Sequence, residues 1–240
     1  MEVVATKGTN NTLTITACND TANHKAATIW AKDKLLLSGK GTLNIIATGD
    51  GCRGIKTKKD ITIEELTLNV TTSGDNLGEK PFGFGGGMPD FGGFFMPFGG
   101  NNNQPDTTPA IIIRGGTVYA WSKVGSPEEG LDCDFAPLVV EGGTIFSVGG
   151  GMGEMPSVPS NEDAKQPTAL LIGLNVVKNE PIYIYDGNGK QINTVTIPFS
   201  LRRSASLVSS PAFKLSSTYT VKTKGYERTF TLNEPFTTVR

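Results

Sequence analysis

Histidine is almost absent from this chain, which contains only His24. Catalytic serine or cysteine arrangements need a histidine beside the nucleophile, and His24 has neither a Gly-x-Ser-x-Gly segment nor an acidic pattern to accompany it. Cysteine is scarce as well, and Cys18, Cys52 and Cys133 show no Cys-x-x-Cys spacing, which disfavours a zinc site. Their odd number argues against a full disulfide framework, so we expect small buried thiols in a β core.

Long apolar runs and helical periodicity are also missing. No run approaches the roughly 18 apolar residues of a membrane span, and no segment repeats apolar residues at helical spacing. The formal net charge of −1 leaves no basic footprint for nucleic acid. The opening Met1-Glu2-Val3-Val4 lacks the basic and apolar regions of a signal peptide. We expect a secreted or cell-surface protein without a membrane span, whose signal peptide has been removed from the sequence.

Short apolar runs bounded by glycine, asparagine, aspartate and proline dominate instead, and they predict many short strands. Gly41-Thr42-Leu43-Asn44-Ile45 returns as Thr67-Leu68-Asn69-Val70, and Gly116-Thr117-Val118-Tyr119-Ala120 returns as Gly143-Thr144-Ile145-Phe146-Ser147. Leu43 and Leu68 are 25 residues apart, and Val118 and Ile145 are 27 apart. A repeat of this length with glycine turns is typical of a solenoid, and we call its repeating unit a rung.

The predicted fold is therefore all-β, a right-handed parallel β-helix in which each rung covers the apolar row of the next. Residues two apart on a strand share a face, which predicts two buried columns and one outward row. The first column holds Leu43, Leu68, Val118 and Ile145, the second Ile45, Val70, Ala120 and Ser147, and the outward row Asn44, Asn69, Tyr119 and Phe146. An antiparallel sandwich is the alternative, because it also explains the short strands, although not the repeat.

We predict a division into two parts. Residues 1–168 form the β-helix, and residues 169–240 form an antiparallel β cap over its open end, because the terminal rungs of repeat proteins need covering. Asp186-Gly187-Asn188-Gly189 indicates a hairpin within this cap. Residues 77–108 are rich in glycine, phenylalanine and methionine and interrupt the repeat, so we expect this insert to lie outside the solenoid.

Three glycine-rich segments, taken in their order, resemble a known family: Gly41-Thr42-Leu43-Asn44-Ile45, Gly49-Asp50-Gly51-Cys52-Arg53-Gly54-Ile55-Lys56, and Glu141-Gly142-Gly143-Thr144-Ile145. They are similar to segments of the bacterial carbohydrate-binding-domain β-helix proteins. The resemblance implies a pectate-lyase-like fold and binding of plant polysaccharides, with calcium and without cleavage. Where related proteins tend to carry paired aspartates before the Gly-Ile step, this chain has one carboxylate, Asp50, and the nearby Arg53.

The best candidates for binding a hard cation are four acidic residues near a predicted turn: Glu128, Glu129, Asp132 and Asp134. Calcium takes about six to eight oxygen ligands, which loop carboxylates and backbone carbonyls can supply. Asp132 and Asp134 share one face of the strand. We therefore predict calcium as the cofactor, bound at a corner of a rung.

Two sets of side chains are candidates for binding a polysaccharide. Tyr119, Trp121 and Phe146 point outward on adjacent rungs, where they would form a flat aromatic platform for sugar rings. The alternative is that the insert or the cap covers these rings, because large exposed apolar patches are rare. Lys56, Lys58 and Lys59 form a basic strip on one rung, with Lys32 and Lys34 on the rung before. This strip would either meet an acidic sugar chain or form an ordinary solvated face.

Enzyme signatures are scarce, and the adjacent carboxylates Glu64 and Glu65 would point to opposite faces of a strand. We predict a non-enzymatic protein that binds a polysaccharide at the bacterial cell surface. Two alternatives stay open. One is a structural or adhesive module that contacts another protein through the insert, and the other is a polysaccharide lyase with a lysine or arginine base.

Overall fold

The structure is a computed structural model, and it describes residues 1–17, 27–48, 52–57, 59–72, 110–123, 130–131, 137–149 and 157–240. The regular secondary structure assigned in these residues consists of β-strands only, which confirms the predicted all-β class. No helix in the described part of the chain could cross a membrane. The predicted insert, residues 77–108, lies outside the described residues.

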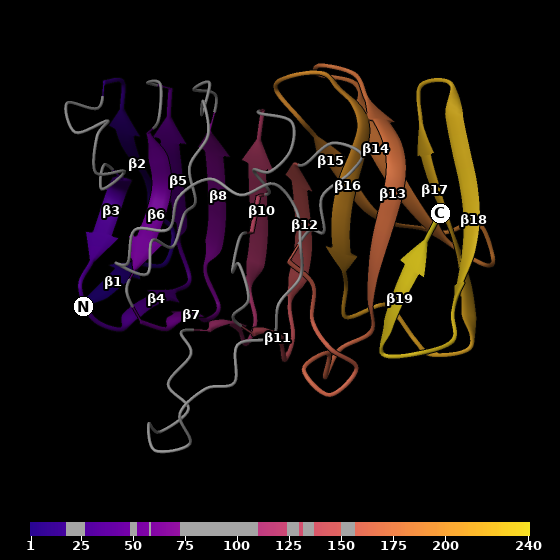
Figure 1. The fold of residues 1–240 in the computed structure, drawn as a ribbon, viewed down its shortest axis with the longest axis horizontal. Coiled ribbons are helices and arrows are strands. Elements are labelled where there is room, and N and C mark those ends of the chain that lie inside the picture. The colour runs from indigo at the N-terminus through magenta and orange to yellow at the C-terminus, as the bar shows by residue number, and fades with distance from the viewer. Residues whose placement is uncertain are drawn as a thin grey trace, which may run out of the picture.

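From the N-terminus to β12, successive strands visit the same sheets in turn (Figure 1). Sheet A contains β1 (Glu2–Ala5), β4 (Leu35–Gly39), β7 (Ile61–Ile63), β9 (Ile111–Ile113) and β11 (Leu138–Val140). Sheet B begins with β2 (Asn10–Ile15), β5 (Thr42–Ala47), β8 (Thr67–Thr72), β10 (Thr117–Ser122) and β12 (Thr144–Gly149). Sheet C contains β3 (Ala27–Ala31) and β6 (Arg53–Thr57).

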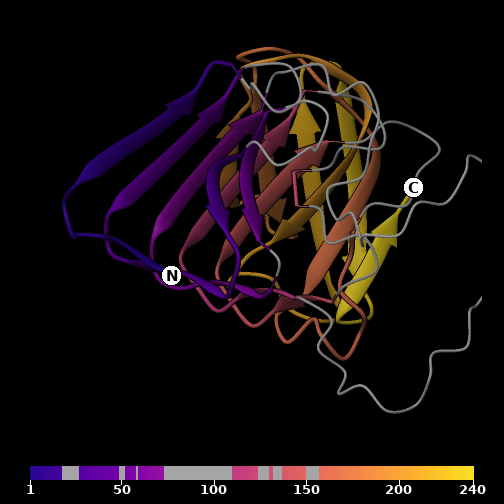
Figure 2. The same cartoon turned by 60° about the vertical axis from the view of Figure 1, so that its left-hand side comes forward.

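Each of these strands pairs in parallel with its equivalent one repeat later, in sheet A, in sheet B and in sheet C. Figure 2 brings the N-terminal end of this arrangement forward and shows the strands of sheet B side by side. The sequence repeat therefore predicted that β5, β8, β10 and β12 become neighbours in this order.

The pairing register confirms the predicted inward columns. Leu43 is opposite Leu68, Leu68 is opposite Val118, and Val118 is opposite Ile145. All four are buried in one apolar cluster that residues of sheets A and C also enter. The second column is likewise in register: Ile45, Val70, Ala120 and Ser147. Because burial of such a side chain stabilises a fold by about 1.5–3 kcal/mol, the repeated inward residues contribute substantially to its stability.

Glycine pairs form the corners that lead into β10 and β12, as the sequence predicted. Gly116 and Gly143 have positive φ angles of 80° and 100°, a conformation that L side chains rarely adopt. A Cβ atom at Gly116 would lie 2.3 Å from the carbonyl oxygen of Leu66 in the preceding rung. Glycine is therefore required at Gly116 both for its backbone angle and for the close approach of two rungs.

The C-terminal part differs from the predicted antiparallel cap. Three of its strands extend sheet B beyond β12: β16 (Leu201–Ser209), β13 (Thr168–Val176) and β19 (Phe236–Val239). β16 is antiparallel to both of its neighbours, but β13 and β19 are parallel, so the prediction of a wholly antiparallel cap is wrong. Sheet B also runs without a break across the predicted boundary at residues 168 and 169.

The remaining four strands do form a separate antiparallel sheet, sheet D: β14 (Pro181–Asp186), β15 (Gln191–Thr196), β17 (Ser217–Thr223) and β18 (Tyr226–Leu232). The hairpin between β14 and β15 is the one predicted from its turn residues. The Asp186 carboxylate accepts hydrogen bonds from the backbone N–H groups of Asn188 and Lys190, both at 2.9 Å. These bonds hold the turn and so fix the pairing of the two strands.

We expect Leu68→Ala to lower the free energy of unfolding by about 2–5 kcal/mol, because a cavity would remain between β5 and β10. Urea denaturation measures this loss. Thr71→Val, a shape-conserving change on the outward face of the same strand, should stay within about 0.5 kcal/mol. Equal effects of the two substitutions would contradict the inward position of Leu68.

Candidate functional site

The three predicted aromatic residues do lie together on the outward side of sheet B. Tyr119 and Trp121 are two apart on β10, and Phe146 of β12 is opposite Tyr119. The Tyr119 and Trp121 rings are stacked with centroids 5.6 Å apart, and the Trp121 and Phe146 rings meet edge to face at 5.9 Å. The strand alternation read from the sequence thus placed these rings side by side.

The rings do not form the exposed platform that we predicted. Phe146 is 0 % exposed and Trp121 only 6 %, in a cluster with apolar residues of sheet D and the C-terminal strands of sheet B. Tyr119 is half-buried at the border of this cluster, and burial raises the pKa of its hydroxyl. The C-terminal strands therefore cover the face, as in the alternative in which the cap buries the rings.

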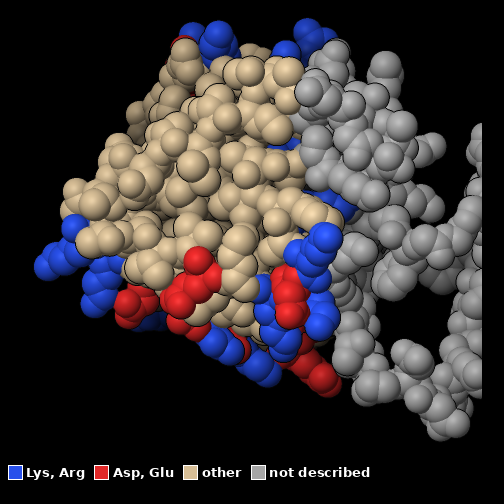
Figure 3. Space-filling view, turned by 90° about the vertical axis from the view of Figure 1, so that its left-hand side faces the viewer, with Lys and Arg blue, Asp and Glu red and all other residues tan. Residues whose placement is uncertain are grey.

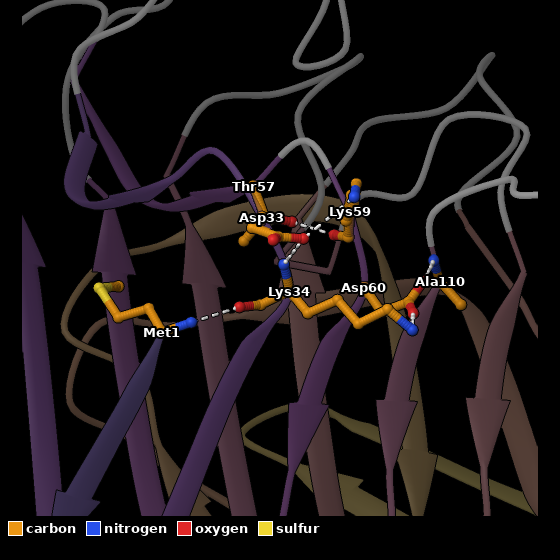
Figure 4. Close-up of polar contacts among 7 residues, drawn as sticks. All are labelled: Met1, Asp33, Lys34, Thr57, Lys59, Asp60 and Ala110. Carbon is orange, nitrogen blue, oxygen red and sulfur yellow. Dashed lines mark hydrogen bonds and ion pairs between the residues drawn. The ribbon is translucent and has the colours of Figure 1, made fainter.

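Part of the predicted lysine strip is engaged in ion pairs near the start of the sheet A strands (Figure 4). Lys34 Nζ lies 2.9 Å from the Asp60 carboxylate, and Lys59 Nζ lies 3.2 Å from that of Asp33. Asp60 also accepts a hydrogen bond of 3.2 Å from the backbone N–H of Ala110. These contacts neutralise two of the strip's cations. Lys58 lies outside the described residues.

The ion pairs shift the pKa values of Asp33, Lys34 and Asp60. The hydrogen bond from Lys34, with that from the Ala110 backbone, lowers the pKa of the Asp60 carboxyl. The hydrogen bond from the Lys34 backbone, followed by the Lys59 side chain, lowers the pKa of Asp33. In return, Asp60 raises the pKa of Lys34. These groups therefore stay charged and paired at neutral pH.

Lys56 belongs to a different setting, on the outward side of sheet C. It is the register partner of Trp30, a half-buried ring that the sequence reasoning did not select. Lys32 places its Nζ atom 5.4 Å from the centre of the Trp30 ring. We call Trp30, Lys32 and Lys56 the Trp–Lys cluster. An indole face with an ammonium group beside it suits a ligand that has both an apolar ring face and negative charge.

The signal for the Trp–Lys cluster was present in the alternation of β3. Ile29 and Ala31 are buried, so the residue between them must face outward. The aligned repeat places Lys56 at the same position one rung later. Comparing the outward positions of Ile29-Trp30-Ala31 and Ile55-Lys56-Thr57 would have paired the ring with the cation.

The outward face of sheet B on β2, β5 and β8 carries a ladder of side-chain amides. Asn69 Nδ2 donates to Asn44 Oδ1 at 2.8 Å, and Asn44 Nδ2 donates to Asn10 Oδ1 at 2.6 Å. Amide ladders of this kind stabilise stacked parallel strands. These amides hydrogen-bond to one another between adjacent strands and so stabilise the strand pairing. Fewer of their polar atoms are then left to hydrogen-bond to a ligand.

The predicted calcium ligands Glu128, Glu129, Asp132 and Asp134 all lie outside the described residues, so the calcium site stays a prediction. Within the described residues, no group of three or more histidine, cysteine, aspartate or glutamate side chains could hold a metal ion.

The expectation of free thiols is wrong for Cys52. Its side chain is buried, as expected, but it is disulfide-bonded. The other two cysteines, Cys18 and Cys133, lie outside the described residues. An odd number of cysteines excludes the pairing of all of them in disulfides, but it does not exclude a single disulfide bond.

Comparison with known proteins gives one match. A family model described as "Carbohydrate-binding domain-containing protein" matches residues 1–177, which is more than half of the 240-residue chain and extends through β13. No curated protein and no solved structure matches the chain.

The burial of Phe146 predicts a structural role. Phe146→Ala should lower the free energy of unfolding by about 3–5 kcal/mol, because it opens a cavity between sheets B and D. Chemical denaturation tests this, with Trp30→Ala as the control from a half-buried ring. A smaller loss for Phe146→Ala than for Trp30→Ala would show that the C-terminal strands do not cover Phe146.

The lowered pKa of Asp60 predicts a dependence of stability on pH. A carboxylate with a folded pKa below its unfolded value stabilises the fold above the unfolded pKa and loses this contribution as pH falls through the folded one. Asp60→Asn should therefore make the free energy of unfolding fall less steeply between neutral and strongly acid pH. Glu162→Gln, at an exposed carboxylate, serves as the control in thermal melts. An unchanged pH profile for Asp60→Asn would refute the contribution of the pair.

Proposed function

Because the chain belongs to the family of carbohydrate-binding domain-containing proteins, we propose that it binds a polysaccharide at the bacterial cell surface without cleaving it. The observation that carries this proposal is the extent of the family match, which covers the whole run of parallel strands and ends with β13. The binding surface then belongs to the rungs, and sheet D lies beyond the matched residues.

We infer further that the rungs wind as a right-handed parallel β-helix. The chain visits sheets A, B and C in this order twice and then, within the described residues, alternates between sheets A and B, which supports this interpretation, as does the parallel pairing of equivalent strands. A solenoid of this kind presents flat, extended outer faces, and such surfaces suit long polymeric ligands.

The Trp–Lys cluster is our candidate contact for the polysaccharide. Trp30 offers an aromatic face at which the apolar face of a sugar ring can stack. The Lys32 ammonium lies beside it and would attract carboxylates along an acidic chain, and Lys56 holds the aligned position on the next strand of sheet C. An acidic polysaccharide therefore fits this face best.

Two cations of the described residues, Arg114 and Lys34, are poor candidates for a lyase base. A lyase needs a lysine or arginine that gives up its proton to act as a base. The hydrogen bond to Glu64, with Glu141 nearby, raises the pKa of Arg114, and Asp60 raises that of Lys34. Both cations are therefore held protonated and are poorly suited to the lyase alternative.

The proposal includes a secreted or surface location and a calcium ion. The disulfide at Cys52 favours an oxidising compartment, which agrees with a secreted or surface location. Calcium at Glu128, Glu129, Asp132 and Asp134 is supported by the sequence alone, and calorimetry with calcium on Asp132→Ala tests it.

Binding of polygalacturonate, measured by isothermal titration calorimetry, tests the proposed function. Trp30→Ala and Lys56→Ala should each weaken binding at least about tenfold, which corresponds to roughly 1.4 kcal/mol. Lys178→Ala removes an exposed lysine outside the family match and should change nothing. Unsaturated products should not accumulate, and their absorbance would favour the lyase alternative. Unaltered affinity in both cluster variants would remove the Trp–Lys cluster from the proposal.

A further inference from the structure

We propose that the outer face of sheet A is a second glycan-binding track, selective for an uncharged polysaccharide. This inference rests on the proposed function, namely that the chain binds carbohydrate, but it concerns a different face and a different class of ligand. It follows from three outward rows of side chains that the parallel register aligns across the strands.

The middle row forms a half-buried floor that is mostly apolar. Leu36 of β4 is opposite Thr62 of β7, Thr62 is opposite Ile112 of β9, and Ile112 is opposite Val139 of β11. All four side chains are half-buried, so no described segment covers them fully. At a strand spacing of about 4.8 Å, this floor is roughly 14 Å long, enough for a short stretch of a linear chain.

A charged row follows the C-terminal ends of these strands. Arg114 lies between two carboxylates, with its Nη1 atom 2.7 Å from Glu64 and its Nε atom 3.3 Å from Glu141. Because the guanidinium binds both neighbours, the three side chains hold one another in place. Their remaining oxygen and N–H positions are therefore oriented before a ligand arrives, which lowers the entropy cost of binding.

The opposite row is formed by Lys34 and Asp60, whose ion pair is drawn in Figure 4. Figure 3 shows acidic and basic side chains intermixed along the lower border of the molecule, which is the side of sheet A in Figure 1. The acidic side chains visible in Figure 3 therefore lie mainly along the border to which sheet A belongs, and further basic side chains lie at the upper border.

A shallow, open depression of about 440 Å³ lies between the two rows at the N-terminal end of the floor. It is formed by residues of β1, β4 and β7 together with Arg114 from beyond β9: Met1, Glu2, Lys34, Leu35, Leu36, Thr62, Glu64 and Arg114. An apolar base with polar groups at its sides matches a sugar ring, which has C–H groups on its faces and hydroxyl groups around its edge.

The charge of the track selects the class of polysaccharide. The carboxylates are Glu2, Asp60, Glu64 and Glu141, against the side-chain cations Lys34 and Arg114, which gives a net charge of −2. A polyanion would be repelled here, in contrast to the Trp–Lys cluster. Every one of these groups except Glu2 is in an ion pair, so the track offers few unpaired charges to a polycation. An uncharged chain of hydroxyl-bearing rings is the ligand that remains.

Thr62→Tyr tests the track by filling the middle of its floor with a residue that strands accept well. The matched control is Thr71→Tyr, on the outward face of the next strand, β8. Thermal melts establish whether each variant is folded. If Thr62→Tyr does not fold, Leu36→Tyr, at the adjacent position of the floor, is used instead. Calorimetry uses four probes: uncharged hexasaccharides of glucose and of mannose, a chitosan hexamer, and polygalacturonate.

We expect at least one uncharged hexasaccharide to bind, and Thr62→Tyr to weaken it at least tenfold while Thr71→Tyr and Trp30→Ala do not. Polygalacturonate affinity should be unchanged in Thr62→Tyr. If polygalacturonate binds through the Trp–Lys cluster but neither uncharged probe binds, the proposed function stands and the second track is wrong. If only chitosan depends on Thr62, the ligand class is wrong. If none of the four probes binds, the proposed function itself fails and the track fails with it.

Discussion

Register between equivalent strands is the constraint on which the rest of this structure depends. An inward residue such as Leu68 is covered by Leu43 on one side and by Val118 on the other, so it has no burial without the neighbouring rungs. A shift of one residue in the pairing of a strand would turn all the inward side chains of that strand outward. The apolar columns therefore fix the register, and the register then fixes the position of every outward side chain as well.

This coupling explains why the outer faces are ordered although nothing in the core requires particular side chains there. Parallel pairing places the same outward position of successive rungs in one line, at the strand spacing of about 4.8 Å. On sheet B the result is the amide ladder that includes Asn44 and Asn69. On sheet A the same geometry joins Glu64, Arg114 and Glu141 through ion pairs. A substitution at one rung therefore acts on its neighbours, because the side chains of a row bind one another.

The sequence predicted the parts of the fold that depend on this repeat. The inward columns, the order of β5, β8, β10 and β12 in sheet B and the glycine corner at Gly116 all follow from aligning the repeated segments. The β14–β15 hairpin was predictable from local turn chemistry alone. The parallel pairing of β13 with β19 was not, because these strands share no repeat and meet only through long-range packing.

The candidate sites were harder to predict, because an outward position can still be buried by another part of the chain. Phe146 and Asn69 occupy the same outward row, yet Phe146 is buried against the C-terminal strands and Asn69 is half-exposed. Periodicity reports which face of a strand a residue is on, and it does not report what packs against that face. Trp30 is the opposite case. It also occupies an outward position, which the repeat aligns with Lys56, but its ring is only half-buried.

The alignment of rows also bears on how a polymer would bind. Each row runs across the strands, so a linear chain that follows a row meets a similar group at every rung, and its binding energy grows with the number of rungs it contacts. The lysines beside Trp30 and the paired charges around Thr62 lie on different sheets of the same rungs. Acidic and uncharged chains could then be held at once, because the ladders that define the two faces are built on one register but share no side chain. Binding of one polysaccharide would alter the affinity for the other only by changing the shared core. The close packing of that core resists a change of register, so the two sites should bind independently.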